Sequence, residues 1–159
     1  MEKGSKCLAV IRVRGEINVR RDIEDTLKML NLTRSCHATL IDDRPSYMGM
    51  LQKVQNHVTW GEVSRDVIAM LLKEKGVLVG NKKITDEYAK RLGFGSIDEL
   101  ADAICNLKVE FSKLPDIKPV FRLHPPSGGY KNSLKKSWRS GGVAGYRGEA
   151  INDLLKRMI

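Results

Sequence analysis

The sequence has few cysteines and no long apolar run. Its three cysteines, Cys7, Cys36 and Cys105, are far apart and form no C-x-x-C pair. Zinc sites usually need such short spacings, so we expect buried structural thiols and no metal site. No run of about eighteen apolar residues is present, which argues against a transmembrane helix. We therefore expect no membrane partner.

The sequence also lacks the marks of a secreted protein and of an enzyme. Its start has no apolar block of the signal-peptide kind, which favours a cytoplasmic location. The three histidines, His37, His57 and His124, are scattered. No set of nucleophile, base and orienting group can be recognised around them. We therefore expect a non-catalytic protein with no cofactor and no small-molecule substrate.

Positive charge is abundant, and it is concentrated in one part of the sequence. Residues 1–62 carry ten Lys/Arg against eight Asp/Glu, and residues 63–116 carry nine against nine. Residues 117–159 carry nine against two, which supplies +7 of the formal net charge of +9. This stretch also contains Trp and Tyr, a combination typical of a surface that binds a polyanion.

Hydrophobic patterning predicts a small α+β unit in residues 1–62, with both helices on one face of a sheet. Apolar and β-branched residues mark the strands, and apolar positions three and four apart mark the helices. Only one face of the sheet looks clearly apolar. The expected elements are a strand over 7–14, a helix from the N-cap Asn18 to about Leu30, a strand over 36–41, a turn at Pro45, a helix over 50–57 and a strand over 58–62.

The rest of the sequence predicts two further parts. In residues 63–114, Ser64, Thr85 and Ser96 are suitable N-caps, so we expect a helical insert packed on the core. In residues 115–159, prolines and glycine pairs interrupt every periodic pattern until Ala150. We expect this third part to be an extended basic region that ends in a short helix.

Several sequence blocks together resemble the ribosomal protein L30 family of the large subunit. Two of them are TLKMLNLTRSCH at residues 26–37 and GMLQKV at residues 49–54, and the spacing between them also fits. VTWGE at residues 58–62 resembles the long form of archaea and eukaryotes, as do LHPP at 123–126 and GGYK at 128–131. Because no long basic extension precedes the first strand, the sequence is more similar to the archaeal form.

This resemblance implies a structural constituent of the large ribosomal subunit in the cytoplasm. It implies a ferredoxin-like β-α-β-α-β core with an antiparallel sheet, which agrees with the element order predicted above. Family members lie against 23S rRNA, and the archaeal form is expected near 5S rRNA and beside neighbouring ribosomal proteins.

Candidate RNA contacts in the basic part combine cations with aromatic rings. Lys and Arg neutralise phosphates and release counterions, and rings can stack on unpaired bases. The alternatives are a solvated tail with its rings packed into the body and, around residues 122–126, a Pro-stiffened linker. The candidates are Arg122, His124, Tyr130, Lys131, Lys135, Lys136, Trp138, Arg139, Tyr146 and Arg147.

Further candidates lie in the first part of the chain. Arg12 and Arg14 end the first strand, and arginine suits phosphate geometry, although both could instead pair with nearby carboxylates. Arg44, Tyr47 and Lys53 fall in or beside the block that resembles the family, so rRNA contact is carried over to them. Gly49 in the same helical pattern costs about 1 kcal/mol relative to Ala, which indicates close approach of a side chain or of nucleic acid.

Two other functions fit the sequence less well. Residues 12–20 faintly resemble the phosphate-binding loop of acylphosphatases, but the second glycine and the asparagine on the second strand are missing. Residues 85–106 have the lengths of a helix-turn-helix DNA reader, but Asp98, Glu99 and Asp102 on its second helix would repel DNA. We therefore predict an rRNA-binding protein whose basic part is disordered when free and becomes ordered along rRNA.

Overall fold

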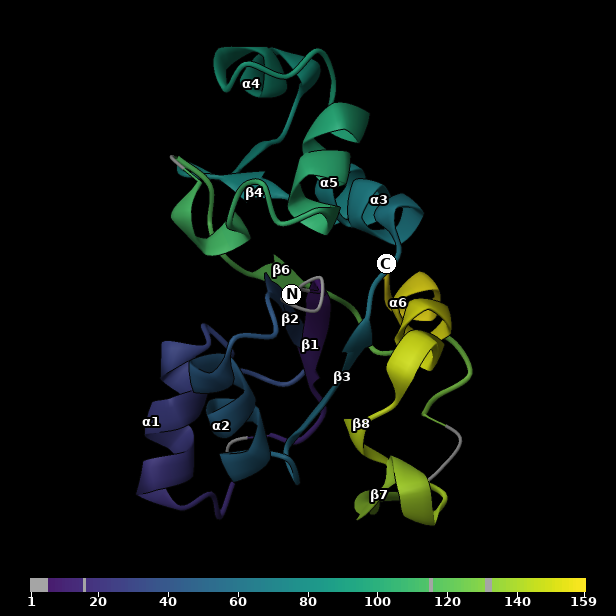
Figure 1. Ribbon diagram of the computed structural model, residues 1–159. Helices are drawn as coiled ribbons and strands as arrows, with labels where there is room; N and C mark the ends of the chain where they lie inside the picture. The colour runs from purple at the N-terminus through teal and green to yellow at the C-terminus, as the bar shows by residue number, and fades with distance from the viewer. Residues whose placement is uncertain (1–5, 16, 115, 131–132) are drawn as a thin grey trace, which may run out of the picture.

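The computed structural model describes residues 6–15, 17–114, 116–130 and 133–159 (Figure 1). In the sheets the strands are β1 (Leu8–Arg12), β2 (His37–Ile41), β3 (Val58–Glu62), β4 (Val77–Leu78), β5 (Lys82–Lys83), β6 (Phe121–Arg122), β7 (Ser133–Ser137) and β8 (Gly142–Tyr146). The α-helices are α1 (Arg21–Met29), α2 (Pro45–Lys53), α3 (Arg65–Lys75), α4 (Asp86–Arg91), α5 (Ile97–Cys105) and α6 (Ile151–Met158). The 3-10 turns are η1 (Phe111–Lys113), η2 (Trp138–Ser140) and η3 (Gly148–Ala150).

The main sheet has the strand order β6-β2-β1-β3-β8-β7. β1 is central and antiparallel to both neighbours, with Val10 opposite Thr39 on β2 and Trp60 on β3. This confirms the ferredoxin-like β-α-β-α-β core with an antiparallel sheet. Outside that core the sheet becomes mixed, because β8 runs parallel to β3 and to β7.

Helices α1 and α2 lie side by side on one face of the sheet (Figure 1), as predicted. Leu27 of α1 and Leu51 of α2 are fully buried against Leu8 and Val10 of β1. Two predicted helix starts are wrong. α1 begins at Arg21 and not after Asn18, whose φ of 58° is left-handed. α2 begins at Pro45, because a proline in the first helical turn loses no hydrogen bond.

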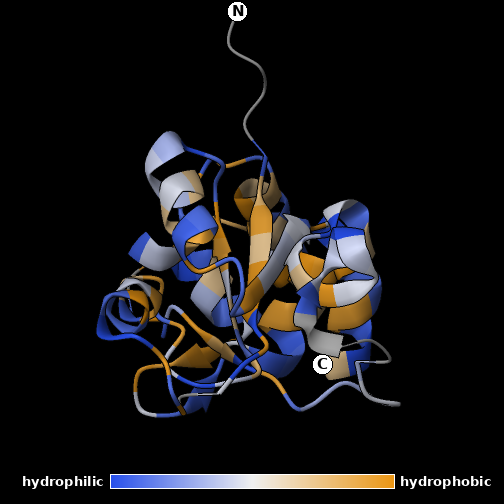
Figure 2. Ribbon diagram, turned by 90° about the horizontal axis from the view of Figure 1, so that it is seen from below, coloured by the Kyte–Doolittle hydropathy of each residue, from blue (hydrophilic) through white to orange (hydrophobic). Residues whose placement is uncertain are grey.

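The opposite face of the sheet is buried as well, under α3, α5 and α6. Ala9 and Ile11 of β1 join a second apolar cluster with Ile68, Leu100 and Leu154 from these helices. The expectation of a single apolar face is therefore wrong, because β1 is apolar on both of its sides. Figure 2 shows the apolar strands between helices that carry both polar and apolar residues.

Residues 63–114 contain the three predicted helices and one short hairpin, but the side chain of Thr85 makes no cap hydrogen bond, so the predicted capping holds for Ser64 and Ser96 only. The hydroxyls of Ser64 and Ser96 accept hydrogen bonds from the amides of Val67 and Glu99, each at 3.4 Å. Helices α3 and α5 pack on each other, and the β4–β5 hairpin lies beside them at the top of Figure 1. Whether this part forms a domain of its own stays a prediction.

The described residues 116–130 and 133–159 are packed into the body and do not form an extended tail. β6 pairs with β2, β8 pairs with β3, and α6 buries Ile151, Leu154 and Leu155 in the core. The backbone of Gly148 crosses β3 so closely that a Cβ on Gly61 would lie 1.9 Å from the Gly148 carbonyl oxygen. The short final helix is confirmed, whereas the extended conformation predicted before it is wrong. In the described ranges no helix has the length and apolar character needed to cross a membrane.

Candidate nucleic-acid interface

Several basic residues meet where β1 ends and its two neighbours begin. Because β1 is antiparallel to β2 and β3, its last residues lie beside the first residues of both. On the far side of β2, Arg122 of β6 pairs with His37. We call this set the basic rim: Arg14, Arg34, His37, His57 and Arg122.

The electrostatics of the two rim histidines reveal a local excess of positive charge. Burial lowers the pKa of His37, and the charges of Arg122, Arg34 and Arg12 lower it further. Burial lowers the pKa of His57 in the same way, with further contributions from Arg14 and Arg12. Both imidazoles are therefore neutral at pH 7, because protonation would add charge to a site that is already positive.

The arginines of the basic rim, of which Arg34 and Arg122 are exposed and Arg14 is half-buried, have no carboxylate partner within the described part of the chain. Arg14, Arg34 and Arg122 take part in none of its ion pairs. A hollow of about 370 Å³ beside Arg14 is lined also by Ile17, whose side chain is 88% exposed. Uncompensated arginines next to an exposed apolar side chain can hold a phosphate and a sugar or base together.

Arg12 does not belong to this exposed surface. It is 1% exposed, and its guanidinium donates to the carbonyl oxygens of Leu32 at 2.8 Å, Arg14 at 2.9 Å and Gly15 at 3.3 Å. The phosphate contact predicted for Arg12 is therefore wrong. The chain that follows α1 covers the side chain, and Arg12 fixes the end of β1 instead.

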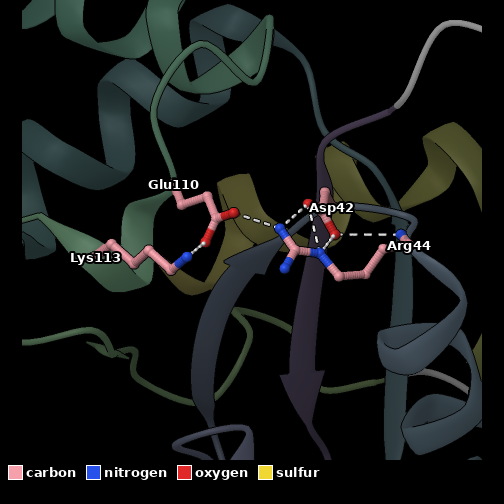
Figure 3. A network of polar contacts seen from close by, with 4 residues as sticks. All are labelled: Asp42, Arg44, Glu110 and Lys113. Carbon is pink, nitrogen blue, oxygen red and sulfur yellow. Dashed lines mark hydrogen bonds and ion pairs between the residues drawn. The ribbon is translucent and has the colours of Figure 1, made fainter.

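Arg44 is also engaged inside the protein (Figure 3). Its Nη2 donates to Asp42 Oδ2 at 2.6 Å and to Glu110, and Lys113 lies 3.3 Å from the second oxygen of Glu110. The network joins the loop before α2 to η1, far along the chain. The predicted rRNA contact of Arg44 is contradicted to this extent: two carboxylates already satisfy its charge.

The same network sets the protonation of its carboxyl groups. Burial acts to raise the pKa of Asp42, but the hydrogen bonds and charge of Arg44 outweigh it and hold that pKa below its usual value. Hydrogen bonding to Arg44 is the main cause of a lowered pKa at Glu110. Both carboxyl groups are therefore ionised at neutral pH, and each can accept hydrogen bonds from the positively charged Arg44 guanidinium.

Tyr47, Gly49 and Lys53 lie on α2, the helix that begins after Arg44. The ring of Tyr47 lies 5.1 Å from the Arg44 guanidinium, which gives the half-buried ring a structural contact. Lys53 is exposed and takes part in no ion pair of the described residues. A Cβ on Gly49 would meet nothing within 4 Å, so the predicted close approach of a neighbouring side chain is wrong.

In the basic part of the chain, three candidate cations are exposed. Arg122, Lys136 and Arg139 have exposed side chains and form no ion pair with any described carboxylate. Lys135 lies in β7, whereas Lys131 lies outside the described residues. These positions remain candidates for phosphate contact.

Three other candidates in this part have polar atoms that already bind within the protein. The two ring nitrogens of His124 lie 2.7 Å and 2.8 Å from the carbonyl oxygens of Pro125 and Ile159. The Tyr146 hydroxyl donates to Glu62 Oε1 at 2.5 Å, and the Tyr130 hydroxyl lies 3.7 Å from the Cys36 sulfur. These contacts fasten the C-terminal part to the core, although the residues His124 and Tyr146 are exposed, Tyr146 to 47%.

Arg147 and Trp138 form a stacked pair. The Arg147 guanidinium lies 4.6 Å from the Trp138 ring centroid and donates to Thr59 Oγ1 at 2.8 Å and to the Val143 carbonyl oxygen at 2.7 Å. Burial, followed by the charge of Arg157, lowers the pKa of Arg147 to about 10. Arg147 is 8% exposed, so its predicted contact on an exposed tail is wrong, whereas Trp138 is 39% exposed.

Sequence reasoning does not single out Arg34 or Arg157. Arg34 lies in the block at residues 26–37 that resembles the L30 family. Its position just before β2 is the feature of the sequence that could have indicated an RNA contact. Arg157 stands in the last turn of α6, where a basic residue is expected for the helix dipole alone. Its Nη1 donates to the carbonyl oxygen of Gly129 at 2.8 Å, a contact that no sequence pattern indicates.

Comparison with known proteins agrees with this architecture. Residues 8–58 match the family model described as Ribosomal protein L30p/L7e. The large ribosomal subunit protein uL30 of Methanopyrus kandleri is 54% identical over 149 residues, which cover 92% of this chain and 100% of that protein. The uL30 protein of Methanosphaera stadtmanae is 51% identical, covering 95% and 99%. That of Hyperthermus butylicus is 46% identical, covering 99% and 93%.

Proposed function

The chain belongs to the ribosomal protein L30p/L7e family, and from this premise we propose that it binds 23S rRNA through its basic rim and its exposed C-terminal cations. It is a structural protein of the large ribosomal subunit, and its location is that of the subunit, in the cytoplasm. Ribosomal proteins of this family are not a class of enzymes.

One observation carries the proposal: the rim arginines gather around His37 and His57, and none of them forms an ion pair among the described residues. Arg34 and Arg122 are exposed and Arg14 is half-buried, whereas several other cations of the described chain are paired with carboxylates. Lys73 pairs with Asp98 at 3.1 Å and Arg65 with Asp102 at 3.5 Å. The acidic residues of α5 therefore form ion pairs with basic residues of α3. When an unpaired arginine binds a phosphate of RNA, it displaces the counterion held there, and the release of that ion favours binding. Arg122 lies in β6, and Arg14 and Arg34 lie within three residues of β1 and β2, so the sheet brings the three arginines to one end of the fold, which suits recognition of RNA by shape.

The proposed contacts come from several elements of the surface, among them α2, β6, β7 and η2. They are cations with no ion pair among the described residues, together with the exposed ring of Trp138. The proposed set is Arg14, Arg34, Lys53, Arg122, Lys136, Trp138 and Arg139, with Lys131 and Lys135 added from the sequence prediction. Contact with 5S rRNA and with neighbouring ribosomal proteins is proposed on the family resemblance alone.

The test measures affinity for an archaeal 23S rRNA transcript over a range of salt concentrations. Replacing Arg14, Arg34 or Arg122 by Ala should weaken binding and lower the slope of log K against log salt by about 1 for each phosphate that the variant no longer neutralises. Lys73→Ala is the matched control, because Lys73 already pairs with Asp98. Rim variants that bind with wild-type affinity and slope would refute the proposed surface. A 5S rRNA transcript and duplex DNA of equal length serve as competitors.

The alternative DNA-reading function has a specific observation against it. In a helix-turn-helix protein the second helix must be free to enter the major groove. Here Leu100 and Ile104 of α5 are buried in the core, and Asp98 and Asp102 face the cations of α3. Weak binding to duplex DNA that competes poorly with rRNA is therefore the expected result.

A further inference from the structure

A small pocket lies between η2 and α6. Its volume is about 180 Å³, and the residues that line it include Tyr130, Trp138, Arg147, Arg157 and Asp153. Aromatic rings, cations and one carboxylate together form an uncommon lining for a pocket that only fills space. In Figure 1 the region is found where the yellow helix α6 lies above β8 and β7.

The first observation that points to a ligand is the charge state of Arg147. This side chain is more than nine-tenths buried, and it contacts the Thr59 hydroxyl, the Val143 carbonyl and the Trp138 ring. In the described part of the chain no carboxylate forms an ion pair with it, and the positive charge of Arg157 acts on it unfavourably. A buried cation without a counter-charge is costly, so an anion in the pocket would stabilise the site.

The second observation is the position of the Trp138 ring. The ring holds the Arg147 guanidinium 4.6 Å from its centroid, yet the residue is 39% exposed. A ring that is fixed by a cation and still open to solvent is a platform for stacking with a base. The Tyr130 ring lines the same pocket, so its lining contains two aromatic surfaces.

We propose that this pocket receives one unpaired nucleotide of rRNA, with its base against Trp138 and its phosphate beside Arg157 and Arg147. Asp153 would repel a phosphate, so it faces the base and accepts a hydrogen bond from an exocyclic amino group. The pocket therefore prefers a base with an amino group, such as cytosine, over uracil. This inference rests on the proposed rRNA binding and deepens it, because it assigns a single nucleotide to a defined set of side chains.

The test is base-by-base chemical probing of an archaeal 23S rRNA transcript bound to the full-length chain. The wild-type chain should protect one unpaired base, and Trp138→Ala should restore its reactivity while the rest of the footprint is retained. Affinity should fall about 5- to 150-fold, as expected for the loss of one stacked base. Trp138→Phe keeps a ring and should retain the protection.

The matched control is Arg139→Ala, which removes an exposed cation next to Trp138 that does not line the pocket. It should lower the salt slope and leave the single base protected. Ultraviolet crosslinking of the unmodified chain gives a readout that needs no variant, and the peptide that contains Trp138 should carry the RNA adduct. If Trp138→Ala leaves every protection in place, or if no adduct forms there, the pocket proposal is wrong. A wild-type chain without any footprint would instead overturn the proposed function itself.

Discussion

The hydroxyl of Thr59 in β3 donates a 2.8 Å hydrogen bond to the carbonyl oxygen of Gly145 in β8, 86 positions later. The Thr59 hydroxyl oxygen in turn accepts a hydrogen bond of 2.8 Å from Arg147 Nε. Thr59 is fully buried, so its hydroxyl, the Gly145 carbonyl and the Arg147 guanidinium form their hydrogen bonds with one another and not with water. The last strand of the sheet is therefore a structural part of the core.

Deleting the chain after Pro119 should abolish cooperative folding. The deletion removes β6 and β8 from both sides of the core sheet, together with the buried residues Leu154 and Leu155 of α6. Unpaired strand edges and exposed apolar surface both favour aggregation. Circular dichroism during thermal unfolding is the measurement. A truncated chain that melts in one sharp transition would show that residues 120–159 are dispensable for folding.

Gly61→Ala should destabilise the protein by about 1 to 3 kcal/mol, the usual cost of overpacking. The new Cβ would collide with the Gly148 backbone, which cannot move away as a flexible side chain could. Gly49→Ala is the matched control, since nothing lies within 4 Å of its Cβ and an alanine in a helix is favoured by up to about 1 kcal/mol. Urea unfolding of both variants checks the opposite signs, and equal effects would contradict the close approach at Gly61.

Arg44→Ala should loosen η1 without weakening rRNA binding. The substitution removes the bridge between Asp42 and Glu110 shown in Figure 3. Hydrogen exchange of the amides around Phe111 should therefore become faster. Lys53→Ala, which removes a nearby exposed cation, should instead reduce the affinity for rRNA. A large loss of affinity in Arg44→Ala with unchanged exchange would restore Arg44 as an RNA contact.

Stability should fall in mild acid because of His37. Its pKa is lowered in the folded state, so the unfolded chain binds a proton more readily. The stabilising contribution is complete above the unfolded pKa of about 6.5 and is lost as the pH falls through the folded value. NMR titration of the imidazole carbon-bound protons should give a pKa below that of a model peptide, and His37→Gln should have a flatter stability profile in this range. A titration midpoint at or above the peptide value would refute the positive surroundings of His37.

The sequence predicts the β-α-β-α-β core well because its signals are local. The apolar spacing of α1 and the N-caps Ser64 and Ser96 identify helices without reference to distant parts of the chain. β6 and β8 could not be recognised in this way. β6 has two residues, and β8 pairs with a strand more than eighty positions earlier. Such short strands are stabilised by pairing with distant strands, and a single sequence does not show which strands will pair.

The candidate site was predictable in kind but not residue by residue. The concentration of charge correctly indicates a basic protein, and RNA contact by Arg14, Arg122 and Arg139, of which the last two are exposed, stays a prediction. The sequence does not distinguish these arginines from Arg12 and Arg147, because burial depends on what packs over each side chain. A sequence shows how many cations a chain has, whereas the fold decides which of them face outward.

The parallel pairing of β3 with β8 also has a consequence for synthesis. Residues 58–62 leave the ribosome long before residues 142–146 are translated, so β3 waits with one edge of its backbone unpaired. A nascent chain in this state is exposed to wrong pairing with other chains. We expect that a chaperone or an early contact with RNA shields β3 until its partner strand emerges.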